Sequence, residues 1–152
     1  MNVFLIRHGY AENIGSEYER GLTPRGAELL KETFSVLKKI EPRIDLIVSS
    51  PLARAMQTAK ILRETFAIEQ EIAEENALAN GAKTEDLLAM LNVLPGDSIA
   101  FVGHQPDLSY HVSNLISNSG ASVTFFPGSV AKVRFDGLPR MRAGVLELLL
   151  HG

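Results

Sequence analysis

Apolar runs that suit buried strands alternate with helical patterns along this 152-residue chain, and this order constrains the fold more than any other feature. The runs Val3–Ile6, Ile44–Val48 and Ser98–Val102 are each followed by a stretch with helical spacing of apolar residues. Strands that alternate with helices form mainly parallel sheets. We therefore expect an α/β fold: a single three-layer domain over residues 1–152, in which helices flank a mainly parallel central sheet.

Start signals mark two of the helices. Thr23 and Pro24 are typical of an N-cap followed by the first helical residue. Ser50 and Pro51 repeat the same pair, which predicts Ser50 as the N-cap of the next helix. The expected helices cover residues 24–40, 52–66, 84–91 and 106–116.

The last third of the chain predicts two further strands. Lys132 and Arg134 alternate with apolar residues, which is typical of a half-exposed strand over residues 131–135. The run Val145–Leu150 is expected beside it as the last strand, and residues 117–128 are expected to form a loop. We expect one edge strand of the sheet to be antiparallel.

The charge and the absence of cysteine exclude several classes of function. The 15 basic and 18 acidic residues give a formal net charge of −3, which offers no general attraction for nucleic acid or an anionic membrane. Without cysteine there are no disulfides, thiolate nucleophiles or Cys-ligated metal sites. Arg7 interrupts the first apolar run, and no apolar stretch reaches the roughly 18–20 residues of a membrane span. We expect a cytoplasmic monomer that binds neither nucleic acid nor membranes.

Reactive side chains follow three of the expected strands at the point where each strand ends. Arg7 and His8 follow the first strand, Arg54 lies in the first turn after the second, and His104 follows the third. The carboxyl ends of parallel strands lie on one edge of a sheet, where open α/β sheets bind ligands. We therefore expect these four side chains to meet, with Gly9 supplying a tight turn.

Two guanidiniums and two imidazoles suit the chemistry of a phosphoryl group. Arg7 and Arg54 offer planar forks of donors that match phosphoryl oxygens. Neutral His8 can attack phosphorus through one ring nitrogen while the other donates to a backbone carbonyl that fixes the tautomer. The cationic surroundings should lower the pKa of His8 and keep the ring deprotonated. His104, if protonated, would stabilise negative charge in the transition state.

Structural roles remain open for single residues. A lone histidine at a strand end, such as His104, is often satisfied by the backbone, and Arg54 alone would often be a surface charge. Ser50 lacks the Gly-x-Ser-x-Gly context of a nucleophilic serine. His111 does not form a His-Glu-x-x-His site, and no glycine signature of a nucleotide site is present. We expect no metal and no cofactor.

Four segments of the chain, in this order, resemble the histidine phosphatase superfamily. Within it, the short length and these motifs are most similar to the SixA-like protein phosphohistidine phosphatases. The resemblance spans most of the chain and implies a phosphoglycerate mutase-like fold. The segments are Arg7-His8-Gly9, Leu22-Thr23-Pro24-Arg25-Gly26, Ser49–Ala59 and Val102–Asp107.

The resemblance also implies roles for the residues at the expected strand ends. His8 would be the nucleophile that becomes phosphorylated. Arg7, Arg54 and His104 would bind the phosphoryl group, with Gly9 beside them. The enzyme would be a metal-independent phosphatase that releases inorganic phosphate.

Two positions depart from the family pattern. Tyr10 stands where the family often has an acidic residue, and the glutamate that serves larger members as general acid has only Glu75 as a candidate. A phosphoramidate leaving group needs less help from an acid than an alkoxide does. The short loops also predict an open site without a large lid. Both points favour phosphohistidine on a protein as substrate, and hence a role in signal transduction.

Two other functions remain possible at this level. The same chemistry could act on a small phosphate ester, since the motifs do not name the leaving group. A noncatalytic module could keep the cationic pocket for recognition alone. The presence of His8 disfavours such a module, because binding requires no nucleophile.

Overall fold

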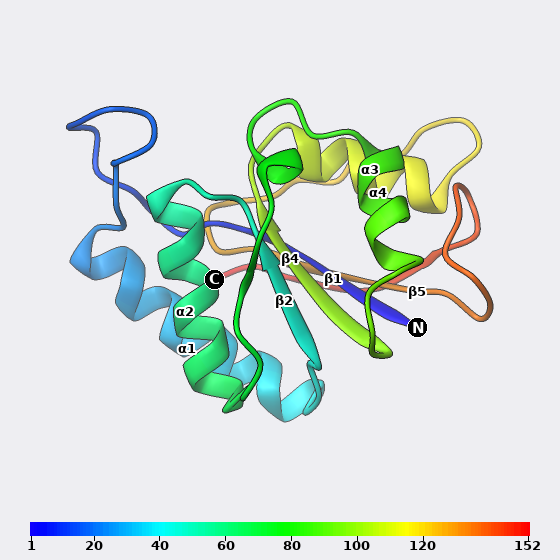
Figure 1. Cartoon of the computed structure of the whole chain (residues 1–152), viewed down its shortest axis with the longest axis horizontal. Coiled ribbons are helices and arrows are strands. Elements are labelled where there is room, and N and C mark those ends of the chain that lie inside the picture. The colour runs from blue at the N-terminus through cyan, green and yellow to red at the C-terminus, as the bar shows by residue number, and fades with distance from the viewer.

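The computed structural model describes residues 1–152 and confirms the expected α/β architecture. The strands are β1 (Asn2–Arg7), β2 (Leu46–Ser49), β3 (Ala73–Glu74), β4 (Ser98–Gly103), β5 (Val130–Arg134) and β6 (Val145–Leu150). The helices are α1 (Pro24–Ile40), α2 (Ala53–Phe66), α3 (Thr84–Leu91), α4 (Asp107–Ile116) and the short 3-10 helix η1 (Asn76–Leu78). All six strands form one sheet in the order β3-β2-β4-β1-β5-β6. Helices α1 and α2 cover one face, and α3 and α4 cover the other (Figure 1).

The sheet is parallel except at β5. Strands β1, β2, β3 and β4 run in the same direction, whereas β5 pairs antiparallel with both β1 and β6. The antiparallel pairing therefore lies at one edge of the sheet. In the centre, Arg7 at the end of β1 stands beside Gly103 at the end of β4. The next residues, His8 and His104, thus leave neighbouring strands at the same height.

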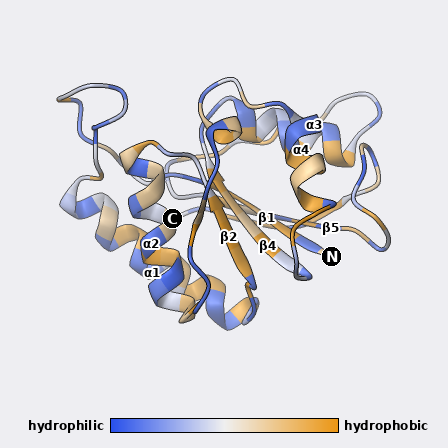
Figure 2. Ribbon diagram, in the orientation of Figure 1, coloured by the Kyte–Doolittle hydropathy of each residue, from blue (hydrophilic) through white to orange (hydrophobic).

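Both faces of the sheet are buried, which explains the continuous apolar run of β1. Val3 and Leu5 pack in the core beneath α3 and α4, while Phe4 and Ile6 pack in the core beneath α1 and α2. Figure 2 shows the same arrangement, with hydrophobic strands between the helical layers. A strand covered on both sides has no reason to alternate with polar residues.

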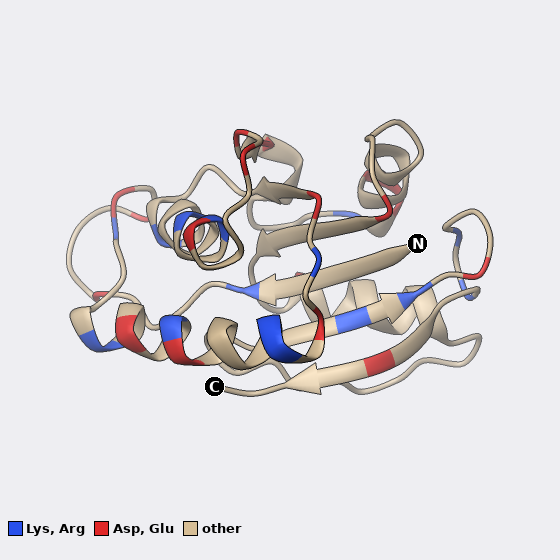
Figure 3. Ribbon diagram, turned by 90° about the horizontal axis from the view of Figure 1, so that it is seen from below, with Lys and Arg blue, Asp and Glu red and all other residues tan.

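The expectation of a half-exposed strand near the carboxyl end is wrong. All but the last residue of β5 are buried, and the Lys132 side chain is only 8% exposed. Its ammonium lies 2.6 Å from Glu41 at the end of α1 and 2.9 Å from Glu147 on β6. Figure 3 shows basic residues on β5 beside an acidic residue on β6. Lys132 can therefore occupy a buried position between apolar residues, because Glu41 and Glu147 neutralise its charge.

The start of α2 also differs from the expectation. Thr23 caps α1 as predicted, since its Oγ1 accepts the N–H of Gly26 at 2.9 Å. Ser50 is not an N-cap: α2 begins at Ala53, with Leu52 as a cap that makes no side-chain hydrogen bond. The N–H of Ser50 donates to Val102 O on β4 at 3.0 Å, so the chain is still held to the sheet at this point. The helix can begin only after the chain has turned away.

None of the helices has the length and apolar character that crossing a bilayer requires.

Candidate active site

His8 lies at the carboxyl edge of the sheet in a single defined tautomer. Its Nδ1 is 2.8 Å from the carbonyl oxygen of Gly9. A carbonyl can only accept, so Nδ1 carries the proton and the ring leaves Nε2 unprotonated. On the other side of the ring, the Nε–H of Arg54 donates to this Nε2 at 3.3 Å. The expected hydrogen bond to a backbone carbonyl is confirmed, and the Nε2 lone pair accepts a hydrogen bond from the Arg54 guanidinium.

Arg54 lies in the first turn of α2 and is buried. Its terminal nitrogens are engaged by one residue of the loop after β1. NH1 donates to the backbone oxygen of Glu17 at 2.7 Å, and NH2 donates to the Glu17 carboxylate at 2.5 Å. The same carboxylate oxygen accepts from Asn80 at 3.1 Å. One guanidinium thus connects the His8 ring to an acidic side chain.

His104 stands next to His8, with the two ring centroids 5.2 Å apart. Its Nε2 is 2.8 Å from the hydroxyl of Ser50, and the oxygen of that hydroxyl accepts the N–H of Leu52 at 3.3 Å. Its Nδ1 is buried and has no hydrogen-bond partner. Ser50 therefore holds the ring by one nitrogen and leaves the other nitrogen available to a ligand.

Arg7 is anchored from the opposite side by the loop before β5. Its NH1 donates to Phe125 O at 2.8 Å, while its buried Nε has no partner. Buried polar atoms without a partner are rare in native structures. Arg7 Nε and His104 Nδ1 are the two such side-chain atoms in this chain, and each belongs to a residue next to His8 in sequence or in space. Arg7 Nε–H can donate to an oxyanion, and His104 Nδ1 can do so when the Ser50 hydroxyl donates to Nε2, because the single ring proton then lies on Nδ1.

The backbone at residue 9 lies so close to α1 that the position favours a glycine. A Cβ at this position would lie 2.7 Å from Leu30 Cδ1, too close for any real side chain. Its N–H donates to Thr58 Oγ1 at 3.1 Å, and that hydroxyl donates to Arg54 O at 2.8 Å. Gly9 thus links the His8 turn to the helix that carries Arg54. Its own N–H is already used within the protein.

The site keeps both histidines neutral. Burial lowers the pKa of His8 from 6.5 to about 4. The charges of Arg54 and Arg7 lower this pKa further, whereas the hydrogen bond to Gly9 opposes the shift. Burial, together with His8 and Arg54, lowers the pKa of His104 from 6.5 to about 3. The expected fall in the pKa of His8 is confirmed, with burial as its largest cause. The positive charge considered for His104 is absent from the ligand-free site at neutral pH.

Glu75 lies at the same sheet edge, because its N–H donates to Ser49 O at the end of β2. Its carboxylate caps η1 by accepting the N–H of Ala77 at 3.3 Å. No hydrogen bond joins Glu75 to His8, Arg54 or His104. No group of three or more His, Asp or Glu side chains is arranged to hold a metal ion.

Glu17 and Asn80 reach the site from segments that sequence reasoning did not single out. Glu17 lies in a loop with no motif around it, and Asn80 follows η1. Ser50 and Thr58 were part of a recognised segment, but nothing in the sequence pointed to their contacts with His104 and Gly9. The site is less open than expected, because the Glu17 side chain covers Arg54.

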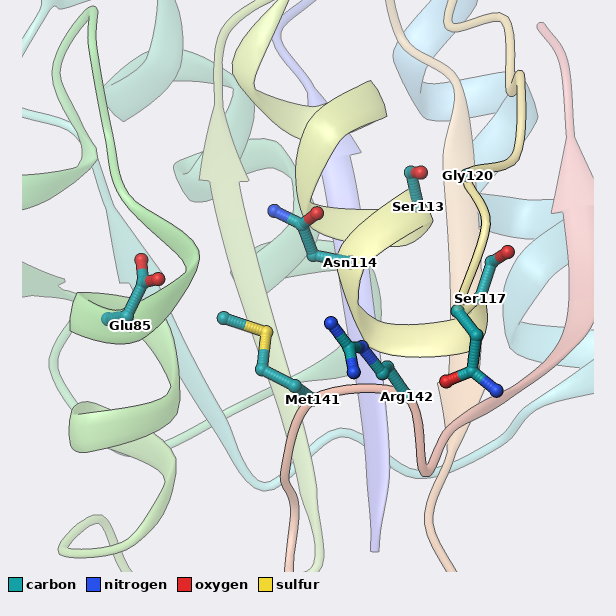
Figure 4. A pocket seen from close by; sticks show the side chains of 8 residues that line it. Glu85, Ser113, Asn114, Ser117, Gly120, Met141 and Arg142 are labelled. Atoms are coloured by element: carbon teal, nitrogen blue, oxygen red, sulfur yellow. The ribbon is translucent and has the colours of Figure 1, made fainter.

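The surface hollows do not coincide with this site. None of the five is lined by His8, Arg54 or His104. The hollow in Figure 4 measures about 310 Å³ and lies at the carboxyl end of α4, whereas His104 precedes the start of that helix. It is lined by Glu85, Ser113, Asn114, Ser117, Asn118, Gly120, Met141 and Arg142.

Known proteins share both the sequence pattern and the fold. A phosphohistidine phosphatase SixA homolog of Haemophilus influenzae is 28% identical over 99% of this chain and 94% of its own length. The structure of the protein histidine phosphatase SixA complexed with tungstate superposes with a TM-score of 0.86 at 23% identity, covering 99% of this chain and 96% of that one. A phosphoserine phosphatase of Entamoeba histolytica gives a TM-score of 0.73 at 17% identity, over 97% and 95% of the two chains.

The family model provides the assignment. Residues 3–81, more than half of the chain, match the histidine phosphatase superfamily (branch 1). The matched segment contains β1 from its second residue, the turn with His8, and the start of α2 with Arg54. With its sheet order, its paired histidines and this match, the chain belongs to the histidine phosphatase superfamily.

Proposed function

We propose that this protein is a metal-independent phosphatase that removes phosphoryl groups from phosphohistidine on a protein, through a covalent intermediate on His8. The orientation of His8 carries the proposal: its Nδ1–H is fixed by Gly9 O, and its unprotonated Nε2 faces Arg54. A ring held in this way is ready to attack as a neutral nucleophile without first losing a proton.

In the first step, the lone pair of His8 Nε2 forms a bond to phosphorus while the bond from phosphorus to the leaving nitrogen breaks. The leaving imidazole takes up a proton, for which Glu75 and solvent are the candidate donors. The His8 ring gains positive charge as the new bond forms, and the hydrogen bond from Nδ1–H to Gly9 O stabilises that charge.

The phosphoryl oxygens need donors that match their developing charge. Arg7, Arg54 and His104 surround the nucleophile, and Arg7 Nε and His104 Nδ1 lack partners within the protein. Preorganised donors of this kind stabilise the transition state without reorganisation. In the second step, water attacks the phosphorus from the side that the leaving group vacated. The bond between phosphorus and His8 then breaks, and inorganic phosphate leaves.

The phosphohistidine substrate is supported by two observations. The SixA homolog of Haemophilus influenzae aligns over nearly the whole chain. No acidic side chain is hydrogen-bonded to the ring of His8 or His104, which suits a leaving nitrogen better than a leaving alkoxide. The cytoplasmic location, the monomeric state and the role in signal transduction remain predictions from the sequence.

Transfer of labelled phosphate tests the reaction. A protein domain carrying ³²P on histidine should pass the label to His8 and then to free phosphate. The intermediate should be acid-labile, and His8→Ala should abolish both steps. EDTA should leave the rate unchanged. Turnover by the His8→Ala variant would rule out the covalent route, and faster turnover of sugar or nucleotide phosphates would identify a small-ester phosphatase instead.

A further inference from the structure

Glu17 occupies the guanidinium that the proposed substrate needs. Its carboxylate accepts from Arg54 NH2 at 2.5 Å and from Asn80 Nδ2 at 3.1 Å, and its second oxygen accepts from Arg20 NH2 at 3.0 Å. A carboxylate and a phosphoryl group present the same kind of charged oxygens to an arginine fork. Glu17 therefore makes the contact that a phosphoryl oxygen would make in the proposed reaction.

The contact covers Arg54 in the ligand-free protein. Arg54 is buried, with 4% of its side chain exposed, whereas the Glu17 side chain is 54% exposed. A ligand that approaches Arg54 from solvent meets the carboxylate first.

Only the carboxylate has to leave. The loop around Glu17 is tied to the start of α2, because the N–H of Ala53 donates to Tyr18 O at 3.0 Å. The backbone oxygen of Glu17 also accepts from Arg54 NH1 at 2.7 Å. Rotation of the exposed Glu17 side chain would free NH2 while these two backbone contacts stay in place.

The carboxylate stays ionised across the neutral range. Hydrogen bonds from Arg54, Arg20 and Asn80 lower the pKa of Glu17 from 4.5 to about 2. The pair is nevertheless partly in water, where ion pairs are weak. A ligand with more negative charge than one carboxylate can therefore replace it.

We propose that Glu17 is a specificity-determining residue that occupies Arg54 in place of the phosphoryl group, so that only a strongly charged tetrahedral oxyanion displaces it. This inference rests on the proposed function, because it takes Arg54 as a phosphoryl ligand. A ligand must displace the Glu17 carboxylate from Arg54 in order to bind. A dianionic phosphoryl group can do so, whereas monoanions bind poorly.

Titration calorimetry with tungstate and with inorganic phosphate tests the competition without any turnover. Glu17→Gln removes the charge and keeps the shape of the side chain. We expect it to bind both anions roughly three- to fivefold more tightly than the unmodified protein, as suits the loss of a partly solvated ion pair. Asn80→Ala, which loosens the carboxylate alone, should shift binding in the same direction by less.

Glu19→Gln is the matched control. Glu19 lies two residues further along the same loop, is exposed and makes no ion pair, so its substitution changes the net charge equally. We expect its affinity for both anions to stay within about twofold of the unmodified protein. An equal gain in both variants would show a general charge effect and would overturn the inference.

The steady-state parameters give a second readout. Displacement of Glu17 predicts a lower KM for Glu17→Gln. If Glu17 instead only positions Arg54, the substitution should weaken anion binding and raise KM, which would refute the inference. Equal tungstate binding by both proteins, with the ³²P transfer to His8 intact, would refute the role of Glu17 alone. Failure of either protein to bind tungstate would count against both this inference and the phosphoryl site itself.

Discussion

Acidification offers a quantitative test of the His8 environment. Burial is the main cause that holds the pKa of His8 at about 4, and Arg54 and Arg7 add to it. At about pH 5.5, a pKa of about 4 leaves roughly thirty neutral rings for each protonated one. A histidine with its ordinary pKa would have only about one neutral ring in eleven at the same pH. The difference in available nucleophile is therefore about tenfold.

NMR of the imidazole carbons in the ligand-free protein measures this pKa directly. The value of kcat/KM also reports ionisation of the free enzyme, and the part due to His8 should change by less than about twofold between pH 7.5 and 5.5. The substrate has its own titration, so the NMR value is decisive. Arg54→Ala should raise the pKa of His8 only part of the way, since burial remains. A pKa near 6.5 for His8 in the unmodified protein would refute the reasoning.

The same shift links pH to stability. The folded protein keeps His8 and His104 neutral to lower pH than the unfolded chain does, so the unfolded state binds more protons between about pH 3, the pKa of folded His104, and pH 6.5. Stability should therefore rise with pH through this window and be lost as the pH falls through it. Urea unfolding at about pH 7 and pH 5 measures the change. An unchanged urea midpoint between these two pH values would show that folding does not lower the pKa values of His8 and His104.

Three substitutions test other parts of the site. Arg54→Ala should lower kcat/KM on the order of a hundredfold or more, as for the loss of a charge-stabilising donor, and a twofold loss would place Arg54 outside the site. Ser50→Ala removes the only side-chain hydrogen bond of His104 and should lower kcat on the order of tenfold, with altered ¹⁵N shifts of that ring; unchanged shifts would contradict the positioning role. Gly9→Ala forces a Cβ against Leu30, which is 1% exposed, and should cost about 1–3 kcal/mol of stability in urea unfolding, whereas an unchanged midpoint would show that Leu30 yields freely.

The elements that carry the site were predictable because their signals are local. The β1 run is apolar on both faces, Thr23 caps α1 through its own side chain, and α3 begins at Thr84 and ends at Leu91 as expected. Strand ends then placed Arg7, His8 and His104 on one edge by topology alone. For these residues, the sequence positions and the parallel direction of the strands were sufficient information.

The remaining features depend on contacts between distant segments. Lys132 was expected to face water, but Glu41 and Glu147, far away in sequence, neutralise it inside the protein. Ser50 was expected to cap a helix, but the sheet holds its backbone and His104 takes its hydroxyl. No motif or spacing in the sequence indicates that Glu17 contacts Arg54. Its role arises only when a flexible-looking polar loop folds onto α2.

The register between the ends of β1 and β4 limits which parts of the protein can change without loss of the reaction. His8 and His104 owe their spacing to two adjacent strands whose last residues, Arg7 and Gly103, stand in register. Because side chains alternate between the faces of a strand, a one-residue insertion in either strand would send one imidazole to the opposite face. Lengthening the loops would leave that geometry intact. Over evolutionary time, new leaving groups can therefore be accommodated by changes in the loops, whereas the two central strands cannot gain or lose a residue without losing the reaction.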